Sequence, residues 1–328
     1  MNAYLRRLTF IFAALALGIA SSAMAQTTSS SYPTKPVRMV MGYPPGGGID
    51  TLARIMAPRL SERWPYQVVL DNRPGASGNI GADIVAKAPP DGYTLLMITL
   101  SHAVGAGLYP KLPFHPADSF SGVSLIGATT LALVSNPSSP LKTVKDVIDA
   151  AKARPGQLSF GSSGVGGSPH LAGELFKLQA GIDIVHIPYK GSGLSLVDLM
   201  GGHVPLLMAA LPGALPHIKS GKIRAIAVTS MQRSPAMPEV PTMAESGIPG
   251  YDVKHWFGVL APAGTDRRTL ERLHGEFVAV LRMPDVVDAF AKAGADPLSN
   301  TPREFDAYLR SEIARWTKVI RAAGVKAE

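Results

Sequence analysis

The sequence predicts an α/β protein in which parallel strands are wound with helices. Short apolar, β-branched runs alternate along the chain with segments whose apolar residues recur at helical spacing. Three connections from a strand to the following helix are rich in glycine. The chain has 328 residues, of which 46% are hydrophobic and 17% charged, so it can bury a substantial core in one large domain or two modest ones.

Six runs are expected to form strands, because each is short, apolar and rich in β-branched residues. They are VRMVMGY (37–43), QVVLD (67–71), TLLMITL (94–100), LSFGS (158–162), IDIVHI (182–187) and IRAIAVT (223–229). Strands that alternate with helices favour parallel sheets with right-handed helical connections. Ligands of such sheets bind in the crevice outside the carboxyl ends of the strands.

The helices between these strands are marked by spacing and by capping residues. One helix is predicted over 49–60, and Pro58 is expected to kink or shorten it. Ser168 is expected to cap a second helix, with Pro169 in its first position. Thr and Glu in TPRE (301–304) have the spacing of a capping box. The apolar face of the first helix comprises Ile49, Leu52, Met56 and Leu60.

Residues 1–25 have the pattern of a secretory signal peptide. Arg6 and Arg7 precede the apolar run LTFIFAALALGIA (8–20), and AMA (23–25) supplies small residues for cleavage. A membrane anchor is the alternative, but the run is shorter than the about 20 apolar residues that span a bilayer. We therefore expect a secreted chain.

Cysteine is absent, which excludes disulfides, thiol nucleophiles and cysteine-based metal sites. The formal net charge of +8 would suit anionic ligands. Lysine and arginine are scattered, however, with no run of five or more, so nucleic acid is not an expected partner.

The three glycine-rich turns are GYPPGGGID (42–50), FGSSGVGGSPH (160–170) and IPYKGSG (187–193). One such turn alone is most simply a tight connection. Three together favour the capture of an anion at helix N-termini, where unpaired N–H groups and the helix dipole attract negative charge.

Motifs of the common enzyme and cofactor classes are missing. No stretch matches the Walker P-loop, the G-x-G-x-x-G dinucleotide fingerprint, the G-x-S-x-G nucleophile elbow or H-E-x-x-H. A triad assembled from scattered Ser, His and Asp stays open but has no positive support. We expect no enzyme activity, no cofactor and no metal.

Long segments of the chain resemble one family, in order and at matching spacing. The chain after residue 25 is similar to the periplasmic solute-binding proteins of tripartite tricarboxylate transporters, the Bug or TctC family. The segments that carry the resemblance are YPPGGGID (43–50), NRPGASGNIGADIVAKAPPDGYTLL (72–96), LYPKLPFHPADSF (108–120), FGSSGVGGSPHLAGELF (160–176), IPYKGSG and DLMGGHV (187–204), LPHIKSGKIRAIAVTS and RSPAMPEVPTMAESGIPGY (215–251), and WFGVLAPAGT (256–265).

The resemblance implies a type II periplasmic-binding-protein fold, a Venus flytrap of two α/β lobes that close on a ligand in the cleft between them. Lobe 1 would comprise 32–130 and 253–328, and lobe 2 would comprise 131–252. The implied function is capture of an organic carboxylate in the periplasm, by a monomer, for delivery to membrane transporter subunits. A sensing module for a histidine kinase is the alternative, and a secreted hydrolase is a third.

The resemblance also implies that backbone amides of one loop per lobe hold a ligand carboxylate. In the first lobe this loop runs from Tyr43 to Asp50. Asp50 would pair with a ligand amine or simply cap its helix. Ser101 and His102 are expected to reach the mouth of the cleft. The amide donors of the first loop would be Gly46, Gly47 and Gly48.

The second lobe would supply hydroxyl and amide donors together with one positive charge. Lys190 stands at a turn where solvation is the alternative to ligand binding. His255, beside Trp256, would donate to a carboxylate if it faces the cleft, and otherwise has a structural role. The other donors expected from this lobe are Ser162, Ser163, Gly166, Ser168 and Tyr189.

One departure from the family pattern bears on specificity. Ala209 and Ala210 stand where many members carry an acidic or amide side chain. A cleft lined by these alanines with Met208 and Leu211 would favour a larger or more apolar carboxylate, such as an aromatic acid, over citrate or an amino acid.

Overall fold

A computed structural model describes residues 32–109 and 111–326. The predicted signal peptide lies outside the described residues. The account below concerns the compact unit that begins at Lys35. No helix among the described residues combines the length and the apolar character needed to cross a membrane.

The strands form a mixed sheet in the order β2-β1-β3-β9-β4-β7-β5-β6, with β8 and β10 also paired to β4. β1 is parallel to β2 and β3, and β5 is parallel to β6 and β7. β9 is antiparallel to both of its neighbours. The strands are β1 (Val37–Met41), β2 (Val68–Asn72), β3 (Thr94–Thr99), β4 (Phe120–Ser135), β5 (Ser159–Ser162), β6 (Val185–Pro188), β7 (Leu206–Ala210), β8 (Arg224–Val228), β9 (Lys254–Pro262) and β10 (Asp296–Pro297).

The six strands predicted from sequence are confirmed as β1, β2, β3, β5, β6 and β8, each within a few residues of its expected bounds. Sequence reasoning missed β4, β7, β9 and β10. The predicted parallel pairing is confirmed at both ends of the sheet, whereas β4 and β9 run antiparallel at its centre.

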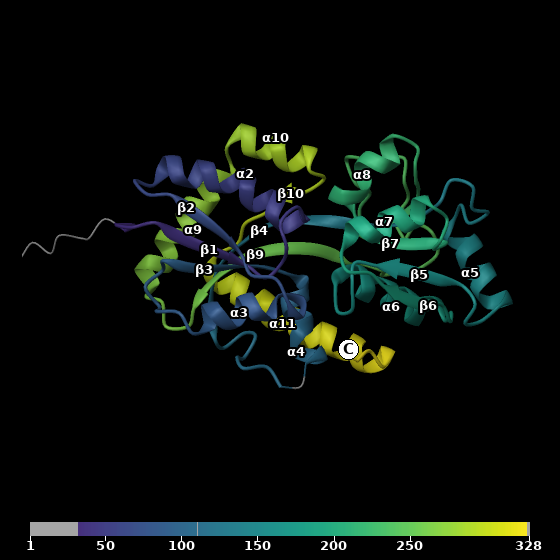
Figure 1. Cartoon of the computed structure of the whole chain (residues 1–328), viewed down its shortest axis with the longest axis horizontal. Helices are drawn as coiled ribbons and strands as arrows, with labels where there is room; N and C mark the ends of the chain where they lie inside the picture. The colour runs from purple at the N-terminus through teal and green to yellow at the C-terminus, as the bar shows by residue number, and fades with distance from the viewer. Residues whose placement is uncertain (1–31, 110, 327–328) are drawn as a thin grey trace, which may run out of the picture. The chain divides into compact units, whose positions relative to one another are not determined.

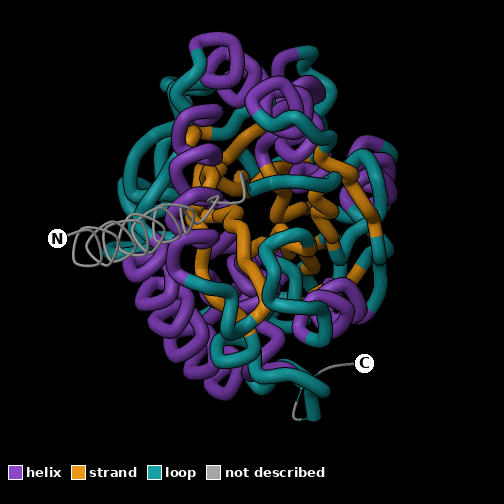
Figure 2. The backbone as a smooth tube through the Cα atoms, turned by 90° about the vertical axis from the view of Figure 1, so that its left-hand side faces the viewer, coloured by secondary structure: helices purple, strands orange, loops and turns teal. Residues whose placement is uncertain are grey.

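Helices cover both faces of the sheet (Figures 1 and 2). In the part of the sheet built on β1 and β3, α2 lies on one face while α3, α4 and α11 lie on the other. The helices are α2 (Gly48–Arg63), α3 (Asn79–Ala86), α4 (Leu100–Leu108), α5 (Val144–Ala153), α6 (Ser168–Ala180), α7 (Ser192–Met200), α8 (Leu211–Lys219), α9 (Arg267–Leu281), α10 (Pro284–Lys292) and α11 (Pro302–Ala323), with a 3-10 turn η1 at Ala76–Gly78.

β4 is the strand that joins the two halves of the sheet. Its first part pairs with β9 up to the register Thr130↔Lys254, and from Leu131 onward it pairs with β7, beginning at Leu131↔Ala210. β8 pairs with the same second part of β4. One long strand therefore belongs to both halves, and the chain crosses between them at this point.

Two helix boundaries differ from expectation. α2 continues past Pro58 to Arg63, so the proline does not shorten it. α6 is capped by Gly167, and Ser168 is its first residue rather than its cap. The capping box at the start of α11 is confirmed, because Thr301 and Glu304 bond to each other's backbone N–H groups.

α11 is the longest helix among the described residues, and buried polar contacts tie it to the centre of the sheet. The indole nitrogen of Trp256 on β9 donates to Glu312 of α11 over 2.9 Å, and Trp256 packs edge-on against Phe305.

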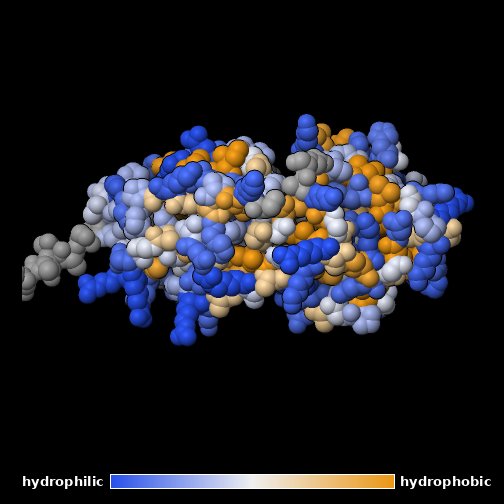
Figure 3. Space-filling model, turned by 90° about the horizontal axis from the view of Figure 1, so that it is seen from below, coloured by the Kyte–Doolittle hydropathy of each residue, from blue (hydrophilic) through white to orange (hydrophobic). Residues whose placement is uncertain are grey.

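The surface is mixed in character: hydrophilic and hydrophobic residues are interspersed on the face seen in Figure 3.

Candidate ligand-binding site

The first glycine-rich loop leads from β1 into the N-terminus of α2. Gly46 has φ +87°, a left-handed conformation that glycine adopts without strain, and Gly47 caps the helix. Gly46 and Gly47 are exposed, and Gly48 is half-buried. Since the first amides of a helix have no acceptor within it, the N–H groups of Gly47 and Gly48 are open to an anion.

Asp50 holds this loop together. Its carboxylate accepts one hydrogen bond from the N–H of Gly46 (3.0 Å) and another from the side chain of Asn72 (3.3 Å). It also forms an ion pair with Arg54 (2.7 Å). Burial raises the pKa of Asp50, but hydrogen bonds from Arg54, Gly46 and Asn72 outweigh it, so the pKa lies below its ordinary value. Gly46 is thus the one predicted amide donor of this loop that is already occupied, and Asp50 is engaged within the loop.

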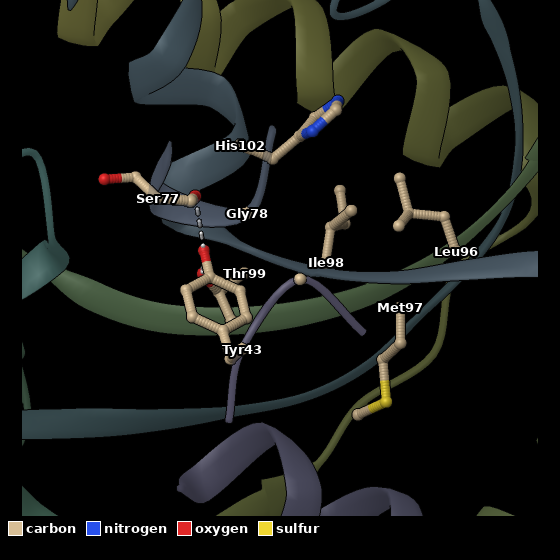
Figure 4. Close-up of a pocket in the computed structure, with 9 residues that line it drawn as sticks. Tyr43, Ser77, Gly78, Leu96, Met97, Ile98, Thr99 and His102 are labelled. Atoms are coloured by element: carbon tan, nitrogen blue, oxygen red, sulfur yellow. Dashed lines mark hydrogen bonds between the residues drawn. The ribbon is translucent and has the colours of Figure 1, made fainter. Parts of the chain in front are cut away.

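Tyr43 closes the space behind the loop (Figure 4). Its hydroxyl donates to the backbone oxygen of Ser77 (3.1 Å) and lies 3.1 Å from the hydroxyl of Thr99. The cavity left beside it measures about 10 Å³, room for a single water molecule. The Tyr43 side chain therefore links the loop to η1 and to the end of β3.

His102 is buried beside the small cavity next to Tyr43. Its ring stacks on Phe114 (6.1 Å) and meets Phe120 edge-on (5.3 Å), and its Nε2 lies 2.8 Å from the backbone oxygen of Pro116. Burial lowers the pKa of His102 to about 4. Ser101, in the first turn of α4, is buried too. This turn of α4 faces inward, and the expected place of both residues at the mouth of the cleft stays a prediction.

The second glycine-rich loop leads from β5 into α6, and both of its ends bond to histidines. The hydroxyl of Ser162 lies 2.7 Å from Nε2 of His186, and the N–H of Gly166 donates to Nδ1 of His170 (3.1 Å). Ser162 and Gly166 are buried, whereas Ser163 between them is half-buried. Ser163 is therefore the serine of this loop whose hydroxyl remains available.

Ser168 and His255 bond to each other. The hydroxyl of Ser168, at the start of α6, lies 2.7 Å from Nδ1 of His255 on β9. Burial lowers the pKa of His255 to about 4, so the ring is neutral. The sequence-based expectation named both residues without predicting that they pair.

The third glycine-rich turn carries Tyr189 and Lys190. The hydroxyl of Tyr189 lies 2.9 Å from a carboxylate oxygen of Asp198, and burial is the main reason that its pKa is raised. Lys190 is exposed. Tyr189 is thus engaged with α7, while Lys190 extends into solvent.

The end of β7 is more buried than expected. Met208 and Leu211 pack inside hydrophobic clusters with less than 2% of their surface exposed, and Ala209 is also buried. Ala210, the N-terminal cap of α8, is half-buried. The interpretation that Met208 and Leu211 line an open cleft was therefore wrong, because both side chains point into the core.

β9 borders the starts of both α2 and α6. A side-chain carbon placed on Gly48 would lie 3.6 Å from Cζ of Phe257. Phe257 meets the ring of His255 edge-on at 4.7 Å, and His255 reaches Ser168. Two helix N-termini from opposite halves of the sheet thus flank one aromatic pair.

Ser77 was not selected from the sequence, yet it connects the two loops. Its hydroxyl donates to the backbone oxygen of Val165 (3.3 Å), while its own backbone oxygen accepts from Tyr43. Asn72, His170 and His186 were missed as well. A polar residue at the end of a strand, as at Asn72, is the signal that could have identified one of them.

A larger groove of about 730 Å³ lies elsewhere, between the end of α8, the segment after β8 and the end of α10. None of the site residues predicted from sequence lines it. Its buried hydroxyls are already bonded, Thr130 to Ser230 and Thr129 to the backbone oxygen of Gly294, and its lysines are exposed. Over the described residues, no group of three or more His, Cys, Asp or Glu side chains could hold a metal ion.

Comparison with known proteins identifies close relatives along nearly the whole chain. Residues 52–325 match the family described as the tripartite tricarboxylate transporter family receptor. Protein BugT of Bordetella pertussis is 41% identical over 322 residues, covering 97% of this chain and 99% of BugT.

Two solved structures from Rhodopseudomonas palustris share the fold. Rpa4515 with adipate has a TM-score of 0.84 and 39% identity, covering 90% of this chain and 99% of its own. MatC with bound malate has a TM-score of 0.80 and 28% identity, covering 88% of this chain and 100% of its own. The α/β architecture described above is therefore that of the periplasmic binding proteins.

Proposed function

The chain belongs to the tripartite tricarboxylate transporter receptor family, and from this premise we propose that it captures an organic dicarboxylate in the periplasm and delivers it to membrane transporter subunits. The members of this family are periplasmic solute-binding receptors, and two relatives of known structure hold adipate and malate. Binding, not chemistry, is the expected role.

The observation that carries this proposal is the pair of helix N-termini on either side of β9. The open amides of Gly47 and Gly48 would hold one carboxylate. The hydroxyl of Ser163, with the first amides of α6, would hold another. Each group donates hydrogen bonds to a negative charge, so an anion with two acidic ends fits the arrangement.

The character of the ligand's middle follows from what borders both helix N-termini. Phe257 beside Gly48 is apolar, so a ligand with an apolar middle would lose no hydrogen bonds there. Adipate in Rpa4515 is an aliphatic dicarboxylate of this kind, whereas the malate of MatC is shorter and carries a hydroxyl. We favour a ligand of the adipate type.

Delivery requires that a partner distinguish the loaded from the empty protein. We propose two lobes, 32–130 with 253–328 and 131–252, that close on the ligand. The switch of β4 from pairing with β9 to pairing with β7 supports this division. The closed form would be stabilised by a ligand that bridges both loops, and the transporter would recognise that form.

Calorimetric titration of the mature protein, residues 26–328, tests the proposal. Adipate should bind more tightly than malate, citrate, aspartate or benzoate, and mass spectrometry should recover it unchanged. Tightest binding of benzoate would favour an aromatic acid instead, and no binding of any carboxylate would overturn the proposed function. Uptake of labelled adipate into vesicles that contain the membrane subunits should then depend on this protein.

A further inference from the structure

Two histidines, His170 buried and His186 half-buried, stack on each other behind the second loop. The rings of His170 on α6 and His186 on β6 lie 3.7 Å apart between centroids, at an interplanar angle of 15°. Phe160 on the neighbouring strand β5 packs against His186, with 5.0 Å between ring centroids. Burial is the main cause that lowers the pKa of His170 to about 4 and that of His186 to about 3, so both rings are neutral at neutral pH.

Each histidine bonds to a different end of the loop. His186 lies 2.7 Å from the hydroxyl of Ser162, where β5 ends, and that hydroxyl also bonds to the backbone oxygen of Gly164 (3.1 Å). His170 accepts the N–H of Gly166, just before α6 begins. The stacked pair therefore spans the base of the loop, with Ser163 between the two attachment points.

We propose that His170 and His186 are positioning residues that hold the 162–166 loop in the shape that presents Ser163 and the first amides of α6 to the ligand. This inference rests on the proposed function. Neither ring touches the ligand in this scheme. His170 takes up an N–H group that would otherwise lack a partner, and His186 adds a further partner to the hydroxyl of Ser162.

The protonation state of His170 follows from its bond to Gly166. A backbone N–H can donate only to an unprotonated nitrogen, so Nδ1 carries the lone pair and Nε2 carries the hydrogen. That Nε2 faces Glu174 at 3.7 Å, and Lys177 pairs with the same carboxylate at 3.0 Å. A proton added at Nδ1 would place two hydrogen-bond donors, Nδ1–H of His170 and N–H of Gly166, face to face. The bond between them would then be lost.

The bond between Gly166 and His170 matters because the backbone is tightly packed at Gly166. Gly166 has φ +73°, and a side-chain carbon there would lie 2.5 Å from Leu108, so the chain is tightly confined at this point. Loss of the bond to His170 would leave a buried N–H without a partner, which is costly. We expect the loop to move rather than leave this amide unpaired.

Isosteric replacements test each contact separately, because the side-chain oxygen of Asn can occupy the place of histidine Nδ1, and that of Gln the place of Nε2. H170N should therefore keep the bond to Gly166, and H170Q should lose it. For His186 the order reverses, with H186Q retaining the bond to Ser162 and H186N losing it. Each pair is a matched control, since both members remove the ring.

Two measurements on each variant separate positioning from general packing. The affinity for adipate should fall about tenfold or more in H170Q and H186N and stay within about threefold in H170N and H186Q. Amide hydrogen exchange of Gly166, followed by NMR in the absence of ligand, should accelerate in H170Q and not in H170N. The nitrogen shifts of His170 in the unaltered protein should show the Nε2–H tautomer.

Equal losses of affinity in both members of each pair would mean that the rings serve packing alone, and would overturn the inference. Unchanged exchange of Gly166 in H170Q would overturn it as well. If the unaltered protein does not bind adipate, the proposed function fails, but the exchange and tautomer measurements still decide whether His170 holds the loop.

Discussion

The hydroxyl of Ser77 donates a hydrogen bond to the backbone oxygen of Val165 over 3.3 Å and so connects the η1 turn to the second glycine-rich loop. The turn itself is strained: Ala76 and Ser77 have φ of 48° and 55°, left-handed values that non-glycine residues rarely adopt. Since Tyr43 bonds to the backbone oxygen of Ser77, a continuous chain of contacts joins the first loop to the second. Strain of this kind persists where the surroundings hold it, as at a ligand clamp.

Replacing Ser77 with alanine should weaken ligand binding without unfolding the protein. The substitution removes the bond to Val165 but leaves the backbone oxygen that accepts from Tyr43. A bond of this type contributes about 1 kcal/mol, so the affinity for adipate should fall about fivefold. Calorimetry measures the change. Ser220→Ala is the control, because the hydroxyl of Ser220 also bonds to a carbonyl, that of His217, but on the exposed end of α8. Equal affinities for Ser77→Ala and the control would show that the bond does not support the bound state.

Replacing Gly47 with valine should abolish binding and preserve the fold. Gly47 has φ −81° and ψ 171°, which valine adopts readily, and a side-chain carbon there would lie no closer than 4.0 Å to the nearest atom, the backbone oxygen of Pro44. The branched side chain would stand over the open amides of α2. We expect an affinity at least about tenfold lower and a loss of about 1 kcal/mol in unfolding free energy, the usual effect of a poor helix cap.

Gly275→Val is the matched control for this variant. Gly275 is exposed on α9, and no atom lies within 4 Å of a side-chain carbon placed there. Gly275→Val should bind adipate with the affinity of the unaltered protein. Normal binding by Gly47→Val would show that the α2 amides do not meet the ligand.

The sequence predicted the outer strands well and the central ones poorly, for a physical reason. β1, β3 and β8 are short, predominantly apolar runs that stand out between polar segments. β4 contains glycines, serines and threonines over 16 residues, because it passes between two halves and bonds to loops on both sides. Its pairing partners come from distant parts of the chain, and no local pattern reports them.

The glycine-rich loops were located correctly from sequence. The sequence did not show which of their backbone N–H groups are bonded within the protein and which are open to a ligand. Gly46 bonds to Asp50, and Gly166 bonds to His170, whereas Gly47 caps α2 and Gly48 is its first residue. Nothing in the glycine pattern distinguishes these cases. The distinction depends on side chains four residues along a helix, whose orientation is set only by the folded backbone.

Ser163 and Ser162 should respond differently to replacement by alanine. The hydroxyl of Ser162 is buried and bonded to His186, so Ser162→Ala should lower the free energy of unfolding by about 1 to 3 kcal/mol. Ser163 is half-buried, and its proposed partner is the ligand, so Ser163→Ala should lower the affinity for adipate by a similar free energy and leave unfolding unchanged. Urea unfolding and calorimetry separate the two effects. An unaltered affinity in Ser163→Ala would leave only backbone contacts from this loop.

The stability of the protein should decline as the pH falls from about 6.5 to about 4. Burial lowers the pKa to about 4 in His102, His170 and His255, and to about 3 in His186, from an ordinary value of 6.5. The unfolded chain therefore binds protons at a higher pH than the folded protein does. Each such histidine contributes stability that is complete above pH 6.5 and declines by about 1.4 kcal/mol per pH unit within that window.

Urea unfolding at intervals between pH 8 and pH 4 measures this decline, and one variant apportions it. His102 packs between Phe114 and Phe120 and bonds to the backbone oxygen of Pro116 rather than to either loop. His102→Phe should therefore reduce the slope of stability against pH by the contribution of one proton and leave ligand binding at neutral pH intact. The loss of the bond to Pro116 should lower stability by a constant amount across the range, which does not alter the slope. A slope equal to that of the unaltered protein would mean that His102 takes up its proton without unfolding, and that the acid sensitivity arises from the histidines around the second loop.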